Sequence, residues 1–299
     1  MSTAVGVQAP AFKRVVVPLD GSAAAEEILP HLVRMKGAID EMLLLHVVPL
    51  VTLSPTAATE AQARLGLQAE KYLMRVYDLV PRSRVRLRVE TGDASERILA
   101  VLNEVEADLL AMTPHSKSGL GPVFFGGTAR RLLKSIDIPI LLAKPGLPRP
   151  SKSIERILVP IGTEAGEETL LEPVVRLAKC LHSELTLLRA NAIIVSQDPV
   201  TGLVLPLPTR QARAELAPSL EQLSRSHPGV PTQVLSVQGD VAPTILDQAR
   251  RMQADLVAMT THARIGFDRI LSGSFAEEVL RGIHTPVLLQ HLRAHDSRN

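Results

Sequence analysis

ADLLAMTPH, at residues Ala107–His115, returns as ADLVAMTTH at Ala254–His262, and seven of the nine positions are identical. Further matches keep the same offset of 147 residues, namely Gly92–Asp93 with Gly239–Asp240 and Ile138–Leu142 with Thr285–Leu289. Nearer the amino end, Val17–Pro18 and Val159–Pro160 match at an offset of 142 residues. The sequence therefore predicts two copies of one domain in tandem, with a net insertion of five residues in the second copy.

Short apolar segments alternate with segments of helical period in the first copy. The expected strands are Arg14–Pro18, Met42–Val48, Val85–Glu90, Asp108–Thr113 and Ile138–Ala143, and the expected helices are Ser22–Lys36, Thr56–Leu79, Ala94–Val105 and Thr128–Ser135. Runs such as Val15–Val17 are apolar on both strand faces, which is typical of buried strands in a parallel sheet. Each copy is therefore predicted as an α/β domain, an open parallel five-stranded sheet with helices on both faces.

The junction between the copies is visible in the composition of the chain. Lys144–Lys152 holds three prolines and a glycine, so it can continue neither a helix nor a sheet. The expected bounds are residues 1–146 for the first domain, 147–153 for the linker and 154–299 for the second domain. Ser196–Arg210, with prolines at 199, 206 and 208, is expected to form an irregular excursion that contains most of the insertion.

Composition excludes several classes of protein. The formal net charge is only +2, so no overall field would draw the chain to nucleic acid or to an anionic membrane. Cys180 is the single cysteine, which excludes an internal disulfide, and it is interpreted as a small buried residue. We find no secretory signal and no apolar run of about 18 residues that could span a membrane. A cytoplasmic protein is therefore expected.

The sequence carries no recognisable catalytic constellation. It lacks Cys/His metal-ligand spacing, a Gly-x-Ser-x-Gly elbow and a Gly-x4-Gly-Lys-[Ser/Thr] phosphate loop, so neither an enzyme nor a metal site is expected. Four arginines alternate along one predicted strand, Arg82, Arg84, Arg86 and Arg88. We interpret them as a solvated strand face or an interdomain contact, because few aromatic residues are present to stack nucleic-acid bases.

A ligand is expected beyond the carboxyl ends of the strands, where the strand order of an open parallel sheet reverses. In the first copy this places the Pro18–Ser22 loop, Val47 and the Thr113–Thr128 loop around one crevice. The last loop is rich in glycine and leads into a predicted helix, an arrangement that can bind phosphate through backbone N–H groups and the helix dipole. Asp20 can accept a hydrogen bond from a ligand amino or hydroxyl group, or it can be a turn carboxylate satisfied locally. Ser22 is expected to cap the following helix.

These motifs together resemble the universal stress protein family. The resemblance rests on Val-Pro-x-Asp-Gly-Ser near the start, the Gly-Asp turns, Ala-Asp-Leu-x-x-Met before a His-containing loop, a Gly-Gly or Gly-Ser pair, and Pro-x-Leu-Leu in a final strand. It covers nearly the whole chain, twice. It implies a Rossmann-like fold of the adenine nucleotide alpha hydrolase type, dimer-like packing between the two domains, and in some members ATP held by a Gly-x2-Gly-x9-Gly-[Ser/Thr] loop.

Transferred residue by residue, the resemblance predicts a nucleotide site with departures from the family pattern. The predicted site residues are Pro18, Leu19, Asp20, Val47, Met112, Thr113, Ser116, Gly126, Gly127 and Thr128 in the first copy, and Gly273 and Ser274 in the second. The loop glycines are replaced by Thr113 and Ser116 in the first copy and by Thr260 and Ala263 in the second, while Gly162 and Ala190 stand at the positions of Asp20 and Val47. If both replaced positions require a positive φ, each side chain costs about 1–2 kcal/mol. Binding would then weaken about 30- to 1000-fold.

Two functions follow from these observations. The first is a stress-response protein that binds ATP or AMP in the first domain, with Asp20 and Val47 at the adenosine. The second is a nucleotide-free adaptor of the same family, in which the fold serves dimerisation, either as a homodimer or as a pseudo-dimer of the two domains. The Gly-Asp pairs are interpreted as tight turns that cap the next helix, and His115 and His262 as structural residues.

Overall fold

The computed structural model describes residues 9–52, 54–80, 84–114, 126–148, 150, 153–162, 168–191, 195–197, 204–206, 229–262 and 275–292. The first half contains five strands and five helices among these residues. In chain order they are β1 (Phe12–Pro18), α1 (Ala23–Glu26), α2 (Leu29–Arg34), β2 (Ile39–Val48), α3 (Pro55–Tyr77), β3 (Val85–Thr91), α4 (Ala94–Glu104), β4 (Leu109–Met112), α5 (Gly127–Ser135) and β5 (Ile140–Leu142).

The second half follows a similar order, although its described residues form one helix after its first strand and the additional strands β8 and β9. Its described elements are β6 (Arg156–Pro160), α6 (Glu168–Leu181), β7 (Glu184–Asn191), β8 (Val195–Gln197), β9 (Val204–Pro206), β10 (Thr232–Gln238), α8 (Val241–Arg251), β11 (Leu256–His262), α9 (Phe275–Gly282) and β12 (Val287–Leu292). The strand order is β3-β2-β1-β4-β5 in the first half and β10-β7-β6-β11-β12 in the second, all parallel within each half. Each half is therefore a doubly wound sheet whose order reverses beside its first strand.

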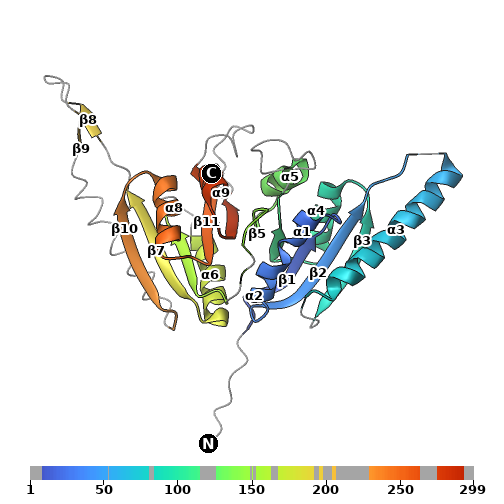
Figure 1. Ribbon diagram of the computed structural model, residues 1–299, viewed down its shortest axis with the longest axis horizontal. Helices are drawn as coiled ribbons and strands as arrows, with labels where there is room; N and C mark the ends of the chain where they lie inside the picture. Colours follow the sequence, from blue (N-terminus) through green and yellow to red (C-terminus); the bar gives the residue numbers. More distant parts are fainter. Residues whose placement is uncertain are drawn as a thin grey trace, which may run out of the picture.

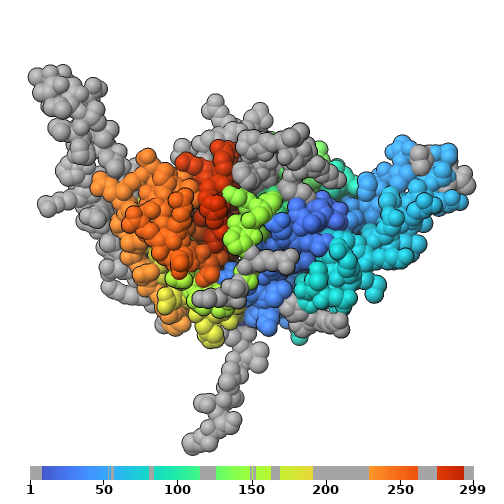
Figure 2. Space-filling view, viewed as in Figure 1, coloured from blue at the N-terminus to red at the C-terminus, as the bar shows by residue number. Residues whose placement is uncertain are grey.

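The two halves join edge to edge into one ten-stranded sheet (Figure 1). The junction is the antiparallel pairing of β5 with β12, in which Leu142 lies opposite Val287 and Ile140 opposite Leu289. The space-filling view shows the first half, from blue to green, and the second half, from yellow to red, as one continuous body (Figure 2). The predicted fold, two tandem open sheets packed as a pseudo-dimer, is confirmed. The domain bounds at residues 146 and 154 stay a prediction.

Buried residues cover both faces of the sheet. Val15 and Val17 belong to one hydrophobic cluster and Val16 to the other, and all three are fully buried. Because successive side chains of a strand point to opposite faces, this alternation means that β1 is packed on both sides. The prediction of a buried central strand from its apolar run is confirmed.

The helix predicted over Ser22–Lys36 is two helices instead. Pro30 has no N–H group to donate to the carbonyl of Glu26 and its ring would crowd that carbonyl, so the α-helical pattern breaks. The backbone bridges the break with shorter hydrogen bonds, from Glu27 N–H to Ala24 O (3.2 Å) and from His31 N–H to Ile28 O (3.1 Å). The expected single helix was therefore wrong, although Ser22 does cap α1 by accepting from Ala25 N–H at 3.1 Å.

Two other expectations need correction. The excursion Ser196–Arg210 is not wholly irregular, because β8 and β9 pair antiparallel from Val195–Pro206 to Gln197–Val204. Cys180 is half-buried rather than buried, and its thiol donates to the carbonyl of Ala9 at 3.4 Å. Among the described residues, no helix combines the length and the apolar character needed to cross a membrane.

Arg86 and Arg88 of the arginine stripe lie on β3 and Arg84 directly precedes it, at the outer edge of the sheet and far in strand order from the second half. The interdomain interpretation is therefore wrong and the solvated-face interpretation is confirmed. Each described arginine of the stripe pairs with carboxylates, Arg84 with Asp40, Arg86 with Glu41, and Arg88 with Glu90 and Glu104. Burial raises the pKa of Glu90, and hydrogen bonds from Arg97 and Arg88 outweigh it, so the pKa is lowered. Arg82 lies outside the described residues.

The Gly-Asp turns end in helix N-caps. Gly92 (φ +137°) and Gly239 (φ +153°) both adopt conformations that disfavour a side chain. Asp93 caps α4 by accepting from Glu96 N–H at 3.1 Å, as predicted. Asp240 occupies the N-cap position of α8 without a side-chain cap hydrogen bond, so the capping prediction fails in the second half.

Gly239→Ala is expected to lower the free energy of unfolding by about 1–3 kcal/mol. The reason is twofold, since the φ is strained for alanine and an added Cβ would lie 2.7 Å from Thr244 Oγ1. Gly66→Ala is the matched control, because no atom lies within 4 Å of its added Cβ in the middle of α3. That control is expected to stabilise the protein by about 0.5–1 kcal/mol. Urea unfolding measures both, and a Gly239→Ala protein as stable as wild type would contradict the account.

Candidate functional site

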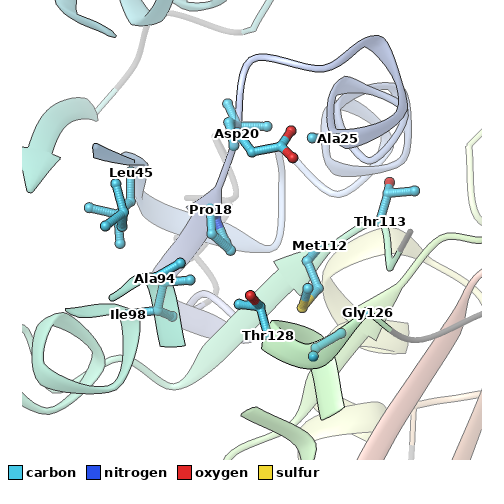
Figure 3. A pocket seen from close by; sticks show the side chains of 14 residues that line it. Pro18, Asp20, Ala25, Leu45, Ala94, Ile98, Met112, Thr113, Gly126 and Thr128 are labelled. Atoms are coloured by element: carbon cyan, nitrogen blue, oxygen red, sulfur yellow. The ribbon is translucent and has the colours of Figure 1, made fainter. Parts of the chain in front are cut away.

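A pocket of about 460 Å³ opens at the carboxyl ends of β1 and β4, where the strand order reverses (Figure 3). Its volume is in the range of small-molecule sites. Nine of the residues predicted for the site line it, namely Pro18, Leu19, Asp20, Val47, Met112, Thr113, Gly126, Gly127 and Thr128. Ser116, Gly273 and Ser274 lie outside the described residues. Segments more than one hundred residues apart in the chain are thus brought to one cavity.

Five further residues line the pocket that the sequence interpretation missed, Ala25, Leu45, Ala94, Ile98 and Ala129. Two simple signals could have found them. Leu45 precedes Val47 by two positions on β2, so the two side chains share a face. Ala94 and Ile98 are four residues apart on α4, which follows the Gly-Asp turn, so they share one face of that helix. The small residues Ala25 and Ala129 stand in the first turns of α1 and α5, where they leave the cavity open.

The loop after β1 holds Asp20 at the pocket. Leu19 continues the strand ladder by donating to Leu45 O at 2.8 Å, and Gly21 then turns the chain with a φ of +88°. Asp20 Oδ1 accepts from both the N–H (3.0 Å) and the hydroxyl (2.6 Å) of Ser22. The local-turn interpretation of Asp20 is therefore confirmed for Oδ1. The residue is also exposed at the pocket, so the turn serves to orient its carboxylate.

The amino end of α5 forms the opposite wall of the pocket. Gly126 is the N-cap of this nine-residue helix, and no side chain caps it. The first N–H groups of a helix have no intrahelical acceptor and carry the positive end of the helix dipole. The helix start at Gly127 and Thr128 thus offers donors for an anionic group, and Thr128 adds a hydroxyl.

Thr113 replaces the first glycine of the family loop without backbone strain. Among the described residues, only Arg84, Glu106, His182 and Gln253 combine a side chain with a positive φ. Thr113 is not one of them, and its side chain is buried. The strain estimated for a positive φ therefore does not apply at this position of the chain, and the loop enters the pocket by a path that a threonine adopts readily.

A cluster of polar and charged side chains lies behind the loop that carries Asp20, on the other face of β2. His46 meets the ring of Tyr72 edge-on at a centroid distance of 5.5 Å, and Arg75 lies 5.3 Å over that ring while pairing with Glu26 at 2.6 Å. Burial lowers the pKa of His46, against the opposing influence of its hydrogen bond to the Leu19 backbone and of the Asp20 charge. Burial, reinforced by Glu26, raises the pKa of Tyr72.

The second half builds its corresponding loop differently. Gly162 stands where the first half has Asp20, so the carboxylate is missing. Arg189 is buried and donates to the carbonyls of Ile161 (3.2 Å) and Gly162. A side chain of the protein thereby binds these two carbonyls.

The repeated Ala-Asp-Leu motif has a structural role. Asp108 accepts from the N–H groups of Lys13 (2.7 Å) and Arg14 (2.9 Å) at the start of β1. Asp255 does the same for Glu155 (3.0 Å) and Arg156 (3.1 Å) at the start of β6. Each aspartate therefore ties the fourth strand of its half to the first.

The remaining candidates give no further site. His115 lies outside the described residues, and His262 ends β11. Among the residues that the structure describes, no three histidine, cysteine, aspartate or glutamate side chains gather as a metal-ligand group.

Comparison with known proteins agrees with this architecture. A model described as the universal stress protein family matches residues 11–144 and 153–291. A universal stress protein of Methanocaldococcus jannaschii is 26% identical over 140 residues, which cover 44% of this chain and 82% of the relative. A solved universal stress protein from Archaeoglobus fulgidus has a TM-score of 0.72 at 17% identity and covers 93% of this chain and 98% of its own. A solved structure from Pseudomonas aeruginosa has a TM-score of 0.60 at 17% identity, covering 95% and 94%.

At these identities the structural likeness shows the fold alone, whereas the family match spans both copies of the repeat. The Val-Pro-x-Asp-Gly-Ser loop and the Gly-Gly helix start, which carry the resemblance in the first half, lie within the first match. The chain therefore belongs to the universal stress protein family.

Proposed function

We propose that the first half binds an adenine nucleotide, ATP or AMP, in the pocket between β1 and β4. One observation carries the proposal. Asp20, Val47 and the Gly126–Thr128 helix start come from three separate segments and line the same 460 Å³ cavity. This combination of an apolar wall, a single carboxylate and an uncapped helix start is what an adenosine with an attached phosphate requires.

Each part of the pocket has a distinct task in this proposal. Leu45, Val47 and Ile98 offer apolar surface to the base. Asp20 accepts from an amino or hydroxyl group of the adenosine, as its orientation by Ser22 allows. The α5 helix start donates to phosphate through its backbone N–H groups. The site does not depend on a glycine at position 113, because Thr113 sits in the pocket wall without a positive φ.

The proposed role is binding rather than turnover, so ATP recovered from the protein should be intact. A cytoplasmic location is part of the same proposal. Thin-layer analysis of the eluted nucleotide checks the first point. Phosphate release that follows the protein through purification and disappears with Gly126→Val would contradict it.

Equilibrium dialysis with labelled ATP tests the proposal. Ala94→Trp, which places an indole in the pocket, should abolish retention of the nucleotide. Ala100→Trp is the matched control, because it lies on the exposed face of the same helix, and it should retain ATP as wild type does. No retention by wild type at millimolar ATP would refute the proposal and leave the nucleotide-free adaptor. Equal retention by both variants would place the nucleotide elsewhere.

Gly127→Ser is expected to bind ATP about 3- to 10-fold more tightly than wild type. The change adds a hydroxyl donor beside the helix start, and no atom lies within 4 Å of the Cβ that a side chain would introduce. Gly127→Ala adds a carbon atom without the hydroxyl and should bind ATP as wild type does. A serine variant that binds no more tightly than the alanine variant would argue against phosphate at α5.

A further inference from the structure

The two halves share a device that holds the loop after the first strand. His46 on β2 lies beside the backbone of Leu19, and the interaction between them opposes the lowering of the pKa of its ring. Arg189 on β7 donates to the carbonyl of Ile161, which occupies the same place after β6. The strand register makes these positions equivalent, because Leu44 pairs with Val17 and Leu187 with Val159, and each donor lies two residues farther on. Both copies thus place a side-chain N–H donor beside the same carbonyl, and in the second half the hydrogen bond is formed.

In the first half this device lies directly beneath the pocket loop. Leu45 and Val47 line the pocket, so His46 between them points to the opposite face of the sheet. Its Cε1 lies 3.8 Å from the position of a Cβ on Gly21, the residue that turns the chain after Asp20. The imidazole therefore lies next to the turn that orients the Asp20 carboxylate.

We propose that His46 is a positioning residue that holds Asp20 ready for the ligand and makes ligand affinity depend on the protonation of its ring. The inference rests on the proposed function, since it concerns the same site. It deepens that function by adding a regulator, the proton concentration, to the ligand.

The direction of the pH effect follows from the groups around the ring. The Asp20 charge acts on His46 from the loop, and Tyr72 of α3 meets the ring edge-on. Behind Tyr72, Arg75 of α3 lies over the Tyr72 ring and pairs with Glu26 of α1. His46 Nδ1 is buried and has no hydrogen-bond partner among the described residues. Protonation there would create a buried N–H donor without an acceptor and a positive charge next to the Asp20 carboxylate. The carboxylate is then drawn to the imidazolium and is lost to the ligand.

The effect must appear on the acid side of neutrality. Burial lowers the pKa of His46 from its usual 6.5, so the ring is neutral at pH 7 and the loop is in its binding arrangement. Lowering the pH through the reduced pKa charges the ring. Nucleotide affinity and the stability contributed by the neutral ring therefore both persist at pH 7 and fall together on acidification. Arg189 cannot lose its proton in this range, so the second half has no such dependence.

The experiment measures ATP affinity by equilibrium dialysis from pH 8 to pH 5 in the full chain. Wild type should lose about tenfold in affinity over this range, with a midpoint below pH 6.5. His46→Gln keeps a neutral donor and should bind at pH 7.5 as wild type does, with a flat pH profile. His46→Leu removes the donor and should bind about tenfold more weakly at every pH.

His31→Gln is the matched control. His31 is a buried histidine of the same half whose pKa is lowered to about 4 by burial and by Arg34, and it does not line the pocket. This variant should keep the wild-type profile. A His46→Gln protein with the wild-type profile, or a His46→Leu protein with wild-type affinity, would overturn the inference.

A second measurement separates this inference from the proposed function. In the protein without nucleotide, the amide NMR signals of Leu19, Gly21 and Ser22 should titrate with the pKa of His46 in wild type and stay constant in His46→Gln. Titrating amides without any ATP binding would refute the nucleotide proposal and keep the loop device. Constant amides in wild type would refute the positioning role whatever the nucleotide does.

Discussion

Replacing Asp255 with alanine will lower the free energy of unfolding by about 3–5 kcal/mol. Asp255 Oδ1 accepts from Arg34 at 2.7 Å, and this pair joins the second half to α2 of the first. The side chains of Arg34 and Asp255 are only 10% and 22% exposed, so removing the carboxylate leaves a cation in a largely buried site. The N–H groups of Glu155 and Arg156 lose their acceptor as well. Urea unfolding followed by circular dichroism measures the loss.

Asp108 provides the matched control for this prediction. It accepts from two backbone N–H groups in the first half as Asp255 does in the second, and among the described residues it forms no ion pair with an arginine side chain. Asp108→Ala should therefore cost less, about 1–3 kcal/mol. The double variant Arg34→Leu/Asp255→Leu should lose less than the sum of the single changes, since the pair leaves together. Equal losses for Asp108→Ala and Asp255→Ala would show that the pair between the halves contributes nothing.

Asp20→Ala will weaken ATP binding by about 10- to 100-fold. The carboxylate is the only acidic group that lines the described pocket, and a hydrogen bond to a charged acceptor is stronger than one to a neutral acceptor. The substitution also removes the acceptor for the Ser22 N–H and hydroxyl, which orient the loop. Isothermal titration calorimetry at pH 7.5 measures the change in affinity.

Asp20→Asn distinguishes the charge from the turn. Asparagine keeps a side-chain oxygen for the Ser22 N–H, so the loop is preserved while the charge is lost. Its affinity should fall between that of wild type and that of the alanine variant. If neither variant differs from wild type, Asp20 is a turn residue alone and the adenosine end of the proposed site is wrong.

The sequence predicted the parts of the fold that depend on pattern. The internal repeat indicated two copies, and the apolar run at Val15–Val17 indicated a strand buried on both faces, because neither inference needs knowledge of distant contacts. The same holds for the Ser22 cap, where a single side chain acts on a neighbouring turn. The single helix predicted over Ser22–Lys36 was wrong because Pro30 interrupts the α-helical hydrogen bonds within a segment of helical period. Pro30 is a local signal that the sequence contains.

The candidate site was predictable only in part. Loops at the carboxyl ends of strands meet by topology, which is why Asp20, Val47 and Gly126 were expected together. His46 was missed because its importance depends on a carbonyl that tertiary folding brings next to it. The role of Asp255 was missed for the same reason, since its partner Arg34 is 221 residues away in the chain. The strain expected at Thr113 was conditional on a backbone angle that no single sequence specifies.

Photolabelling with 8-azido-ATP tests the central claim most directly, because the azide reacts with residues next to the base and peptide mapping then locates it. The account predicts labelling of the first-half peptides that carry Val47 or Ile98, blocked by excess ATP and lost in Ala94→Trp. Labelling confined to residues 153–291, or labelling that excess ATP does not block, would contradict it.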